Sequence, residues 1–519
     1  MLPRRRSFRM LLATLLGLAV LPLLNGWLVT PPPGTACCSV DRWFSSEPLL
    51  RAASAVLYRV GISVAPHQVV VGRDGWLYLG DEQSASLTTH RRAGRASDIR
   101  LGQSYGEGAR RWDAYLRSRG VQAFRILVAP DKETVYPGHL PQWALPPSAP
   151  GVADTLLAHT GTDLFVDSRE VLGRAATTAP SPLFYRHDTH WNPLGASHAF
   201  AALERSLRAD LPYEVWPSAD ERRLLRLRPR AGGDLADSLR LGAWLTDTEP
   251  VLAVSEQLGT RVHRRYASSD QLDPTRVADS RVIPTFPVET HHDQALNTRR
   301  VLWLTDSFGK GMDDLMHRSF GQVVTLHWRD VHKHGGQLVR LIDEVRPELL
   351  IVTVVERALA TPAFASVLQY PPGMATGEPD ASLHKAELLE MSGVEHQGDG
   401  FRTTSGVASL TFRLARPVAG AGGLSLRLIC EDRSAALPVQ VFWRGAHQPR
   451  FHRDQSVRWL HVGAQSSLDR LTTADGRPAE EMQVLRLDLR GQGHCREFRL
   501  QELALRSASA AAETGERPR

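Results

Sequence analysis

Lysine is scarce in this chain of 519 residues, and no basic run occurs beyond the N-terminus. Only four lysines are present, so nearly all of the 62 basic side chains are arginines, and 56 acidic side chains leave a net charge of +6. Proteins that bind nucleic acids gather basic residues on one face or along one helix. Because the basic residues here are spread along the chain, we predict no nucleic-acid partner.

Long hydrophobic runs are also lacking, with one exception at the N-terminus. Basic residues from Arg4 to Arg9 precede an apolar run that extends from Met10 to Val29. A helix of about 20 residues can cross a bilayer, and its basic flank stays in the cytoplasm. Because no small-x-small cleavage site precedes "PPPGTACC", we favour an uncleaved signal anchor over residues 1–30 and a periplasmic protein held at the inner membrane. The alternative is a removed signal peptide and a soluble periplasmic protein.

The four cysteines form two pairs in the sequence. Cys37 and Cys38 are adjacent and poorly placed to bond to each other, so a bond to a partner, an exposed thiol and a lipid attachment stay open. Cys430 and Cys495 lie in a region of short strand-like segments. In an exported protein we predict a disulfide between them, with two buried free thiols as the alternative.

The remaining pattern predicts an α/β domain. Hydrophobic residues make up 42% and charged residues 23%, as in an ordinary globular protein. After a polar, Pro-rich stalk at 31–59, residues 60–360 alternate strand-like and helix-like patterns, which indicates a mostly parallel sheet flanked by helices. The predicted strands and helices include two short strands within 67–80, a helix at 98–119, a strand at 123–130, a helix at 193–208, and the series strand 301–304, helix 309–319, strand 322–326, helix 336–345, strand 349–355.

The pattern changes after residue 360. Residues 361–382 hold Pro, Gly, Ala and Thr with little periodicity and are predicted to be a linker. Residues 383–507 show short alternating strands, which are typical of an all-β sandwich. Residues 508–519 are predicted to be a disordered tail.

The stretch "VLWLTDSFGKGM" places a serine between a strand and a helix. Ser307 then lies at the carboxyl end of a parallel strand, where α/β folds bind ligands. The amide groups of the following helix N-terminus would stabilise an oxyanion formed when a serine hydroxyl attacks an ester. The alternative is a serine that only caps the helix.

A serine nucleophile needs a base, and "HDTHW" offers one. In an extended segment, Asp188 and His190 face the same side, so the carboxylate would orient the imidazole while the other ring nitrogen faces Ser307. Asn192 and Pro193 would cap the next helix and keep the segment extended. The alternatives are a surface pair or part of a metal site.

The metal interpretation lacks further ligands at a suitable spacing. His291, His292 and Asp293 are candidates, but their spacing is not that of a metal site. We therefore predict neither a metal nor a cofactor.

Four segments resemble the alginate O-acetyltransferase family, the AlgX/AlgJ-like proteins with an SGNH-hydrolase-like domain. They are "VVVGRDGWLYLGD", "VAPDKETVYPGHLP", "YRHDTHWNPLGA", and "VLWLTDSFGKGM" with the later "ELLIVTVVERAL". The resemblance implies Ser307 as nucleophile, His190 as base and Asp188 as its partner. Gly233 and Asp234 in "GGDLAD" also resemble a family segment, whose role can be a tight turn alone.

The resemblance implies a function. Ser307 would take an acetyl group, supplied by a separate membrane-bound acyltransferase, and pass it to a hydroxyl of an exported polysaccharide. An acetyl esterase on the same fold and a non-catalytic glycan-binding scaffold of a secretion complex are the alternatives. Arg357 is a candidate substrate contact, with an ion pair to a nearby acid as the alternative.

The C-terminal region resembles carbohydrate-binding sandwiches. Trp443 and Trp459 are candidate platforms for sugar rings, with packing in the core as the alternative, while Phe442 is predicted to lie in the core. Further candidates for stacking or for holding uronate carboxylates are Phe451, Arg444, Arg453 and Arg458.

Overall fold

The computed structural model describes most of the chain from residue 45 onwards. The described residues are 45–257, 261–265, 287–331, 337–369, 386–398, 400–419, 421–430, 437–461, 465–468, 481–490 and 495–507. The predicted anchor, the adjacent Cys37 and Cys38, and the predicted tail lie outside them. Within these ranges, no helix has both the length and the apolar character needed to cross a bilayer.

A seven-stranded sheet forms the centre of the first domain. Its strand order is β4-β3-β11-β9-β10-β8-β7. The first five strands run parallel, while β8 and β7 extend the edge in antiparallel pairing, so the predicted mostly parallel sheet is confirmed. The strands are β4 (Phe165–Asp167), β3 (Ala123–Ala129), β11 (Leu349–Val355), β9 (Asn297–Thr305), β10 (Phe320–His327), β8 (Val288–His292) and β7 (Arg261–Arg265).

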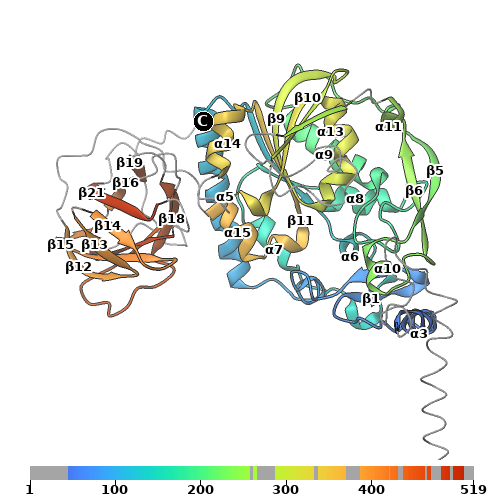
Figure 1. The fold of residues 1–519 in the computed structure, drawn as a ribbon, viewed down its shortest axis with the longest axis horizontal. Coiled ribbons are helices and arrows are strands. Elements are labelled where there is room, and N and C mark those ends of the chain that lie inside the picture. The colour runs from blue at the N-terminus through green and yellow to red at the C-terminus, as the bar shows by residue number, and fades with distance from the viewer. Residues whose placement is uncertain are drawn as a thin grey trace, which may run out of the picture.

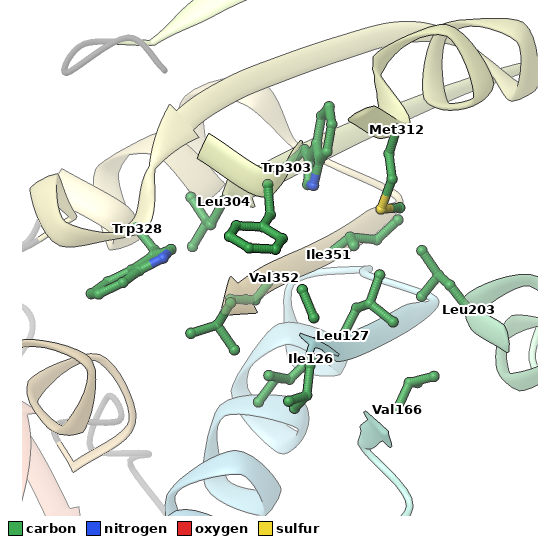
Figure 2. Packing of buried hydrophobic residues seen from close by; sticks show 14 of the residues in the cluster. Ile126, Leu127, Val166, Leu203, Trp303, Leu304, Met312, Trp328, Ile351 and Val352 are labelled. Carbon is green, nitrogen blue, oxygen red and sulfur yellow. The ribbon is translucent and has the colours of Figure 1, made fainter. Parts of the chain in front are cut away.

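Helices cover both faces of this sheet (Figure 1). One face carries α5 (Ala96–Ser118), α7 (Val152–Ala158) and α14 (Gln337–Val345), and the other carries α9 (Pro193–Leu207) and α13 (Asp313–Ser319). Every residue of β3 and of β11 is buried, which explains why both strands are apolar except at Arg125 and Thr353. Figure 2 shows part of this core, with Leu203 of α9 pointing toward Leu127 and Ile351.

The N-terminal end of α9 shows how local sequence sets the geometry near the candidate site. Asn192 caps the helix, because its Oδ1 accepts hydrogen bonds from the backbone N–H groups of Leu194 (3.0 Å) and Gly195 (3.1 Å). Pro193 occupies the first helical position, where no N–H is needed. A side chain at position 195 would clash with the carbonyl oxygen of Leu183, 2.3 Å from a Cβ, so glycine allows the helix to start against that loop.

A small hairpin precedes the sheet. Strands β1 (Val69–Val71) and β2 (Leu77–Leu79) pair antiparallel around a turn in which Asp74 and Gly75 have positive φ angles of 54° and 78°. Its apolar face packs together with α10 (Asp234–Ser238).

The predicted stalk is wrong for its second half. Residues 47–59 form the helix α3 (Glu47–Arg59), which docks on the hairpin. The hydroxyl of Ser54 donates to the carbonyl of Leu239 (2.6 Å), and that of Tyr58 donates to the carbonyl of Gly75 (3.1 Å). The helix is largely exposed despite its apolar residues: Leu49 and Val56 are each 63% exposed, and Ser54 is its only buried residue.

The predicted linker is wrong in its first part. It begins with the helix α15 (Pro362–Gln369), in which Phe364, Val367 and Leu368 are buried. The helix packs against α5, where the indole N–H of Trp112 donates to the carbonyl of Val367 (3.0 Å). Residues 370–382 lie outside the described residues.

The C-terminal region forms two five-stranded sheets with a shared apolar core. A disulfide joins Cys430 to Cys495. The sheets have the orders β12-β15-β20-β17-β18 and β13-β14-β21-β16-β19, and the strands are β12 (Ala386–Ser392), β13 (Val394–Gln397), β14 (Gly400–Thr403), β15 (Ala408–Ala419), β16 (Ala421–Cys430), β17 (Leu437–Arg444), β18 (Ser456–His461), β19 (Gln465–Leu468), β20 (Glu481–Leu489) and β21 (Glu497–Ser507).

The two candidate sugar platforms in this region need correction. Trp443 and Trp459 are 1% and 0% exposed and lie in the core, so neither ring has a face that a sugar can reach. Phe442 is buried as predicted, at 7% exposed, but on the opposite side of β17, because successive residues of a strand alternate between faces. There its ring lies 4.2 Å from the Arg486 guanidinium and packs edge-on against Phe451.

Candidate active site

Ser307 lies at the carboxyl end of β9, where the chain enters a 3-10 turn, η4 (Ser307–Met312), before α13. Asp306 holds this turn in place. One carboxylate oxygen accepts from the N–H of Phe308 (3.0 Å), and the other accepts from the N–H of Val355 (2.8 Å) and the indole of Trp328 (3.2 Å). The serine is therefore fixed to the end of the neighbouring strand β11 as well as to its own strand.

The "HDTHW" segment is a tight loop rather than the predicted extended segment. Residues Phe184 and Trp191 pair as an isolated bridge, and the N–H of Tyr185 donates to the carbonyl of His190 (3.3 Å). This closure brings Asp188 back onto His190, whose own N–H donates to the Asp188 carboxylate (3.1 Å). The close approach comes from the loop and not from strand alternation.

Asp188, His190 and Ser307 form one hydrogen-bonded chain. The Asp188 Oδ1 lies 2.6 Å from Nδ1 of His190, and Nε2 of His190 lies 2.7 Å from Oγ of Ser307. The two halves are 117 residues apart in sequence. The His190 side chain is 24% exposed, so a substrate can approach it. A carboxylate that orients an imidazole, which in turn faces a hydroxyl, is the arrangement that activates a serine nucleophile.

Arg230 is a fourth member of this chain that the sequence did not indicate. It comes from β5 (Leu224–Ala231), which pairs with β6 (Thr246–Leu252), and its guanidinium lies 2.7 Å from the second Asp188 oxygen and 4.1 Å from the ring of Tyr185. Burial alone would raise the pKa of Asp188, but the hydrogen bonds and positive charges of His190 and Arg230 outweigh it and hold that pKa below its usual range. Asp188 therefore stays ionised at neutral pH.

The "GGDLAD" segment has a definite place beside Asp188. A Cβ at position 233 would lie 2.1 Å from the Asp188 Oδ2, so only glycine fits. The next residue, Asp234, accepts from the N–H groups of Thr189 (2.7 Å) and Leu235 (2.8 Å). Asp234 thus ties the start of α10 to the loop that carries His190.

Lys132 links the loop to the N-terminal hairpin. Its buried ammonium donates to the carbonyls of Leu77 in β2 (2.7 Å) and of Arg186 (3.2 Å). Burial lowers the pKa of Lys132 to about 8. Lys132, in the segment "VAPDKE", therefore supports the loop that carries His190. This role was not predicted from the sequence.

Three of these groups resemble a metal-ligand set. One ligand atom each from Asp188, His190 and Asp234 lie within 4.8 Å of one another. However, the Arg230 guanidinium already neutralises Asp188, and Asp234 is engaged by backbone N–H groups. Their environment fits a hydrogen-bonded triad better than a cation site.

Arg357, a candidate substrate contact, instead forms an ion pair with a nearby acid. Its guanidinium pairs with Asp131, and its backbone N–H donates to the same carboxylate (2.8 Å). The side chain is buried, with its guanidinium carbon 5.5 Å from the centre of the Phe308 ring. Arg357 also lines a pocket of about 520 Å³.

Two buried acids in this pocket predict a characteristic pH dependence of stability. Burial, with the Asp131 charge, raises the pKa of Glu133 from 4.5 to about 8, and burial raises that of Glu356 to about 7. At a pH between 4.5 and these raised pKa values, the two carboxyl groups hold protons in the folded state that they have lost in the unfolded chain. Their stabilising contribution is complete below about pH 4.5 and disappears as pH rises to about 8. We expect the free energy of unfolding in urea to fall between pH 5 and 8, by on the order of a few kcal/mol.

The Glu133→Gln variant tests this assignment, because glutamine does not titrate. Its free energy of unfolding should depend less on pH than that of the unmodified chain over the same range. Equal slopes for the two proteins would show that Glu133 ionises normally in the folded state.

Comparisons with known proteins agree with the motifs. Residues 69–276 match the family model described as "SGNH hydrolase-like domain, acetyltransferase AlgX". The curated "Probable alginate O-acetylase AlgJ" of Pseudomonas fluorescens is 28% identical over 153 residues, which are 29% of this chain and 36% of that protein. The chain thus matches only about a third of the length of this relative.

Two solved structures are also similar. The O-acetyltransferase domain of Pseudomonas putida AlgJ has a TM-score of 0.34 and 18% identity, and covers 58% of this chain and 98% of its own. Pseudomonas aeruginosa AlgX has a TM-score of 0.39 and 11% identity, and covers 84% of this chain and 95% of its own. Because both TM-scores are below 0.5, the assignment rests on the sequence matches. They show that residues 69–276 of this chain are similar to the AlgX/AlgJ-like family of SGNH hydrolase-like acetyltransferase domains.

Proposed function

We propose that this protein is a serine-dependent O-acetyltransferase that passes acetyl groups to hydroxyls of an exported polysaccharide. The observation that carries this proposal is the hydrogen-bonded chain from Asp188 through His190 to Ser307. The match of residues 69–276 to an acetyltransferase family model supports acetyl as the group transferred. The name of the curated relative, an alginate O-acetylase, supports a polysaccharide as acceptor.

The first half-reaction acetylates Ser307. His190 Nε2 takes the hydroxyl proton as Oγ attacks the acetyl carbonyl of the donor ester, and the same proton passes to the leaving group when the carbon–oxygen bond to the donor breaks. Asp188 keeps the His190 proton on Nδ1 and stabilises the imidazolium while it exists. Arg230 in turn holds the Asp188 carboxylate.

The second half-reaction uses the same groups. A sugar hydroxyl gives its proton to His190 Nε2 and attacks the carbonyl of the acetyl-serine. The bond between the acetyl carbon and Ser307 Oγ breaks, and Oγ recovers the proton from His190. The products are an O-acetylated sugar and the free serine.

The same proposal includes the setting of the reaction. The chain would act in the periplasm, with its N-terminus at the inner membrane, and receive acetyl groups from a separate membrane-bound acyltransferase. The C-terminal sandwich would hold the polymer, although not through Trp443 or Trp459, which are buried.

Acetyl transfer in vitro tests the proposal. The full chain, in detergent, is incubated with p-nitrophenyl acetate and an oligosaccharide of mannuronate or of neutral sugars, and the sugar is analysed by mass spectrometry. We expect acetylated oligosaccharide in addition to nitrophenol. Release of acetate that does not depend on the acceptor would indicate an esterase, and no ester cleavage at all would indicate a non-catalytic scaffold.

A further inference from the structure

A pocket of about 520 Å³ lies at the same edge of the sheet as Ser307. Its walls come from the carboxyl ends of β3 and β11, from α4 (Ser86–His90), from Arg169 and from the loop before α7. Because β11 lies between β3 and β9 in the sheet, the pocket and the serine occupy neighbouring positions along this edge. Its volume is in the range of sites that bind small molecules.

One phenyl ring separates the pocket wall from the candidate base. Arg357, which lines the pocket, stacks on Phe308 at 5.5 Å, and the same ring lies 5.1 Å from the imidazole of His190. A group bound in this pocket would therefore be held close to the reacting hydroxyl without occupying its place.

Two polar atoms in the pocket wall have no hydrogen-bond partner among the described residues. They are Oε1 of Glu133, whose residue is 2% exposed, and Nε2 of His90. Native proteins leave few buried polar atoms unpaired, because each costs about 1–3 kcal/mol. Both atoms belong to residues that line the pocket, so a ligand there would supply the missing partners.

The charges of the pocket indicate the chemistry of that ligand. Its two arginines are already paired, Arg357 with Asp131 and Arg169 with Asp154 and Glu356. Both arginines of the pocket wall are therefore already engaged by carboxylates, and neither is left to hold the carboxylate or phosphate of a ligand.

The protonation of the two unpaired groups is equally informative. Burial raises the pKa of Glu133 to about 8 and lowers that of His90, so both are neutral at pH 7. A neutral carboxyl and a neutral imidazole each donate one hydrogen bond and accept others. Hydroxyl groups, which also donate and accept, match both.

We propose that this pocket binds a neutral, hydroxyl-rich sugar unit, with Glu133 and His90 hydrogen-bonded to its hydroxyls. That this sugar belongs to the acetyl acceptor rests on the function proposed above. Binding of the sugar itself does not, because it requires neither Ser307 nor an acetyl donor.

Binding is measured by calorimetry on the full chain carrying Ser307→Ala, so that no turnover occurs. The probes are cellopentaose and mannopentaose as neutral sugars and a mannuronate pentamer as the charged comparison. We expect a neutral pentamer to bind at least tenfold more tightly than the mannuronate pentamer.

Paired substitutions locate the binding site. Glu133→Leu should lower the affinity for the neutral sugar at least tenfold. Glu133→Gln should largely retain this affinity, because an amide also donates and accepts hydrogen bonds. Glu170→Leu is the matched control, since the Glu170 side chain is 78% exposed on α8 (Arg169–Ala176). His90→Phe serves as the second test if Glu133→Leu does not fold, which circular dichroism reports.

The outcomes separate the two proposals. If acetyl transfer occurs but Glu133→Leu and His90→Phe change neither sugar affinity nor the KM for the acceptor, the pocket proposal is wrong and the proposed function stands. If a neutral sugar binds in a Glu133-dependent manner but no acetyl is transferred, the pocket proposal stands and the function does not. If no neutral sugar binds, or if Glu133→Leu weakens binding of the mannuronate pentamer more than binding of the neutral sugars, the pocket proposal is overturned.

Discussion

Replacing Ser307 by alanine is expected to abolish acetyl transfer, with a loss of about 10³-fold or more in turnover. The hydroxyl lies 2.7 Å from His190 Nε2, and without it no acetyl-serine can form. His190→Ala should cost a similar factor. The double variant should lose little more than either single one, because the two side chains act as a unit. The measurements are the initial rate of acetyl transfer and the intact mass of the protein after exposure to the donor.

The control for this prediction is Ser366→Ala, because the Ser366 hydroxyl donates to the carbonyl of Ala363 in its own helix α15. It should keep full activity and carry the acetyl group as the unmodified chain does. Acetylation of the chain that survives in Ser307→Ala would contradict the mechanism. Losses that multiply in the double variant would show that serine and histidine act in separate steps.

Replacing Gly233 by alanine should reduce kcat/KM by about 100-fold or more, although the residue touches no substrate. The added Cβ would lie 2.1 Å from Oδ2 and 2.2 Å from Cβ of Asp188, closer than atoms can approach. Asp188 must then move, which lengthens its bonds to His190 and Arg230. The misplaced carboxylate no longer orients the imidazole.

The matched control is Gly138→Ala, because a Cβ at position 138 meets no atom within 4 Å. Thermal unfolding should show a lower Tm for Gly233→Ala only, and the kinetic loss should persist at temperatures where that variant is fully folded. If Gly233→Ala retains the activity of the Gly138→Ala control, the loop tolerates a shifted Asp188 and the proposed orienting role fails.

Local patterns predicted most of the α/β elements because they carry their own signals. The capped start of α9 follows from Asn192 and Pro193, and β3 and β11 follow from apolar runs that only strands covered on both faces can bury. The two short strands around Asp74 and Gly75 likewise follow from residues that tolerate positive φ. In each case the cause lies within a few residues of the effect.

The incorrect predictions concern features whose cause lies in another element of the fold. Alternation along β17 separates Trp443 from Phe442, but it does not say which face of the strand meets the second sheet. The helices α3 and α15 are short, and their neighbours on the hairpin and on α5 supply much of the burial that makes them stable. The reach of Asp188 to His190 depends on a loop closed by a bridge between Phe184 and Trp191.

The sequence by itself determined the residues of the candidate triad and the strand-to-helix turn that carries Ser307, because hydrogen-bonding side chains, caps and apolar periodicity act over short distances. Only the tertiary structure decided that the loop of His190 and the end of β9 meet, that Arg230 holds Asp188, and that Glu133 and His90 line one pocket. These contacts join segments tens to more than a hundred residues apart, and their geometry is set by the order of strands in the sheet and by which helices cover each face.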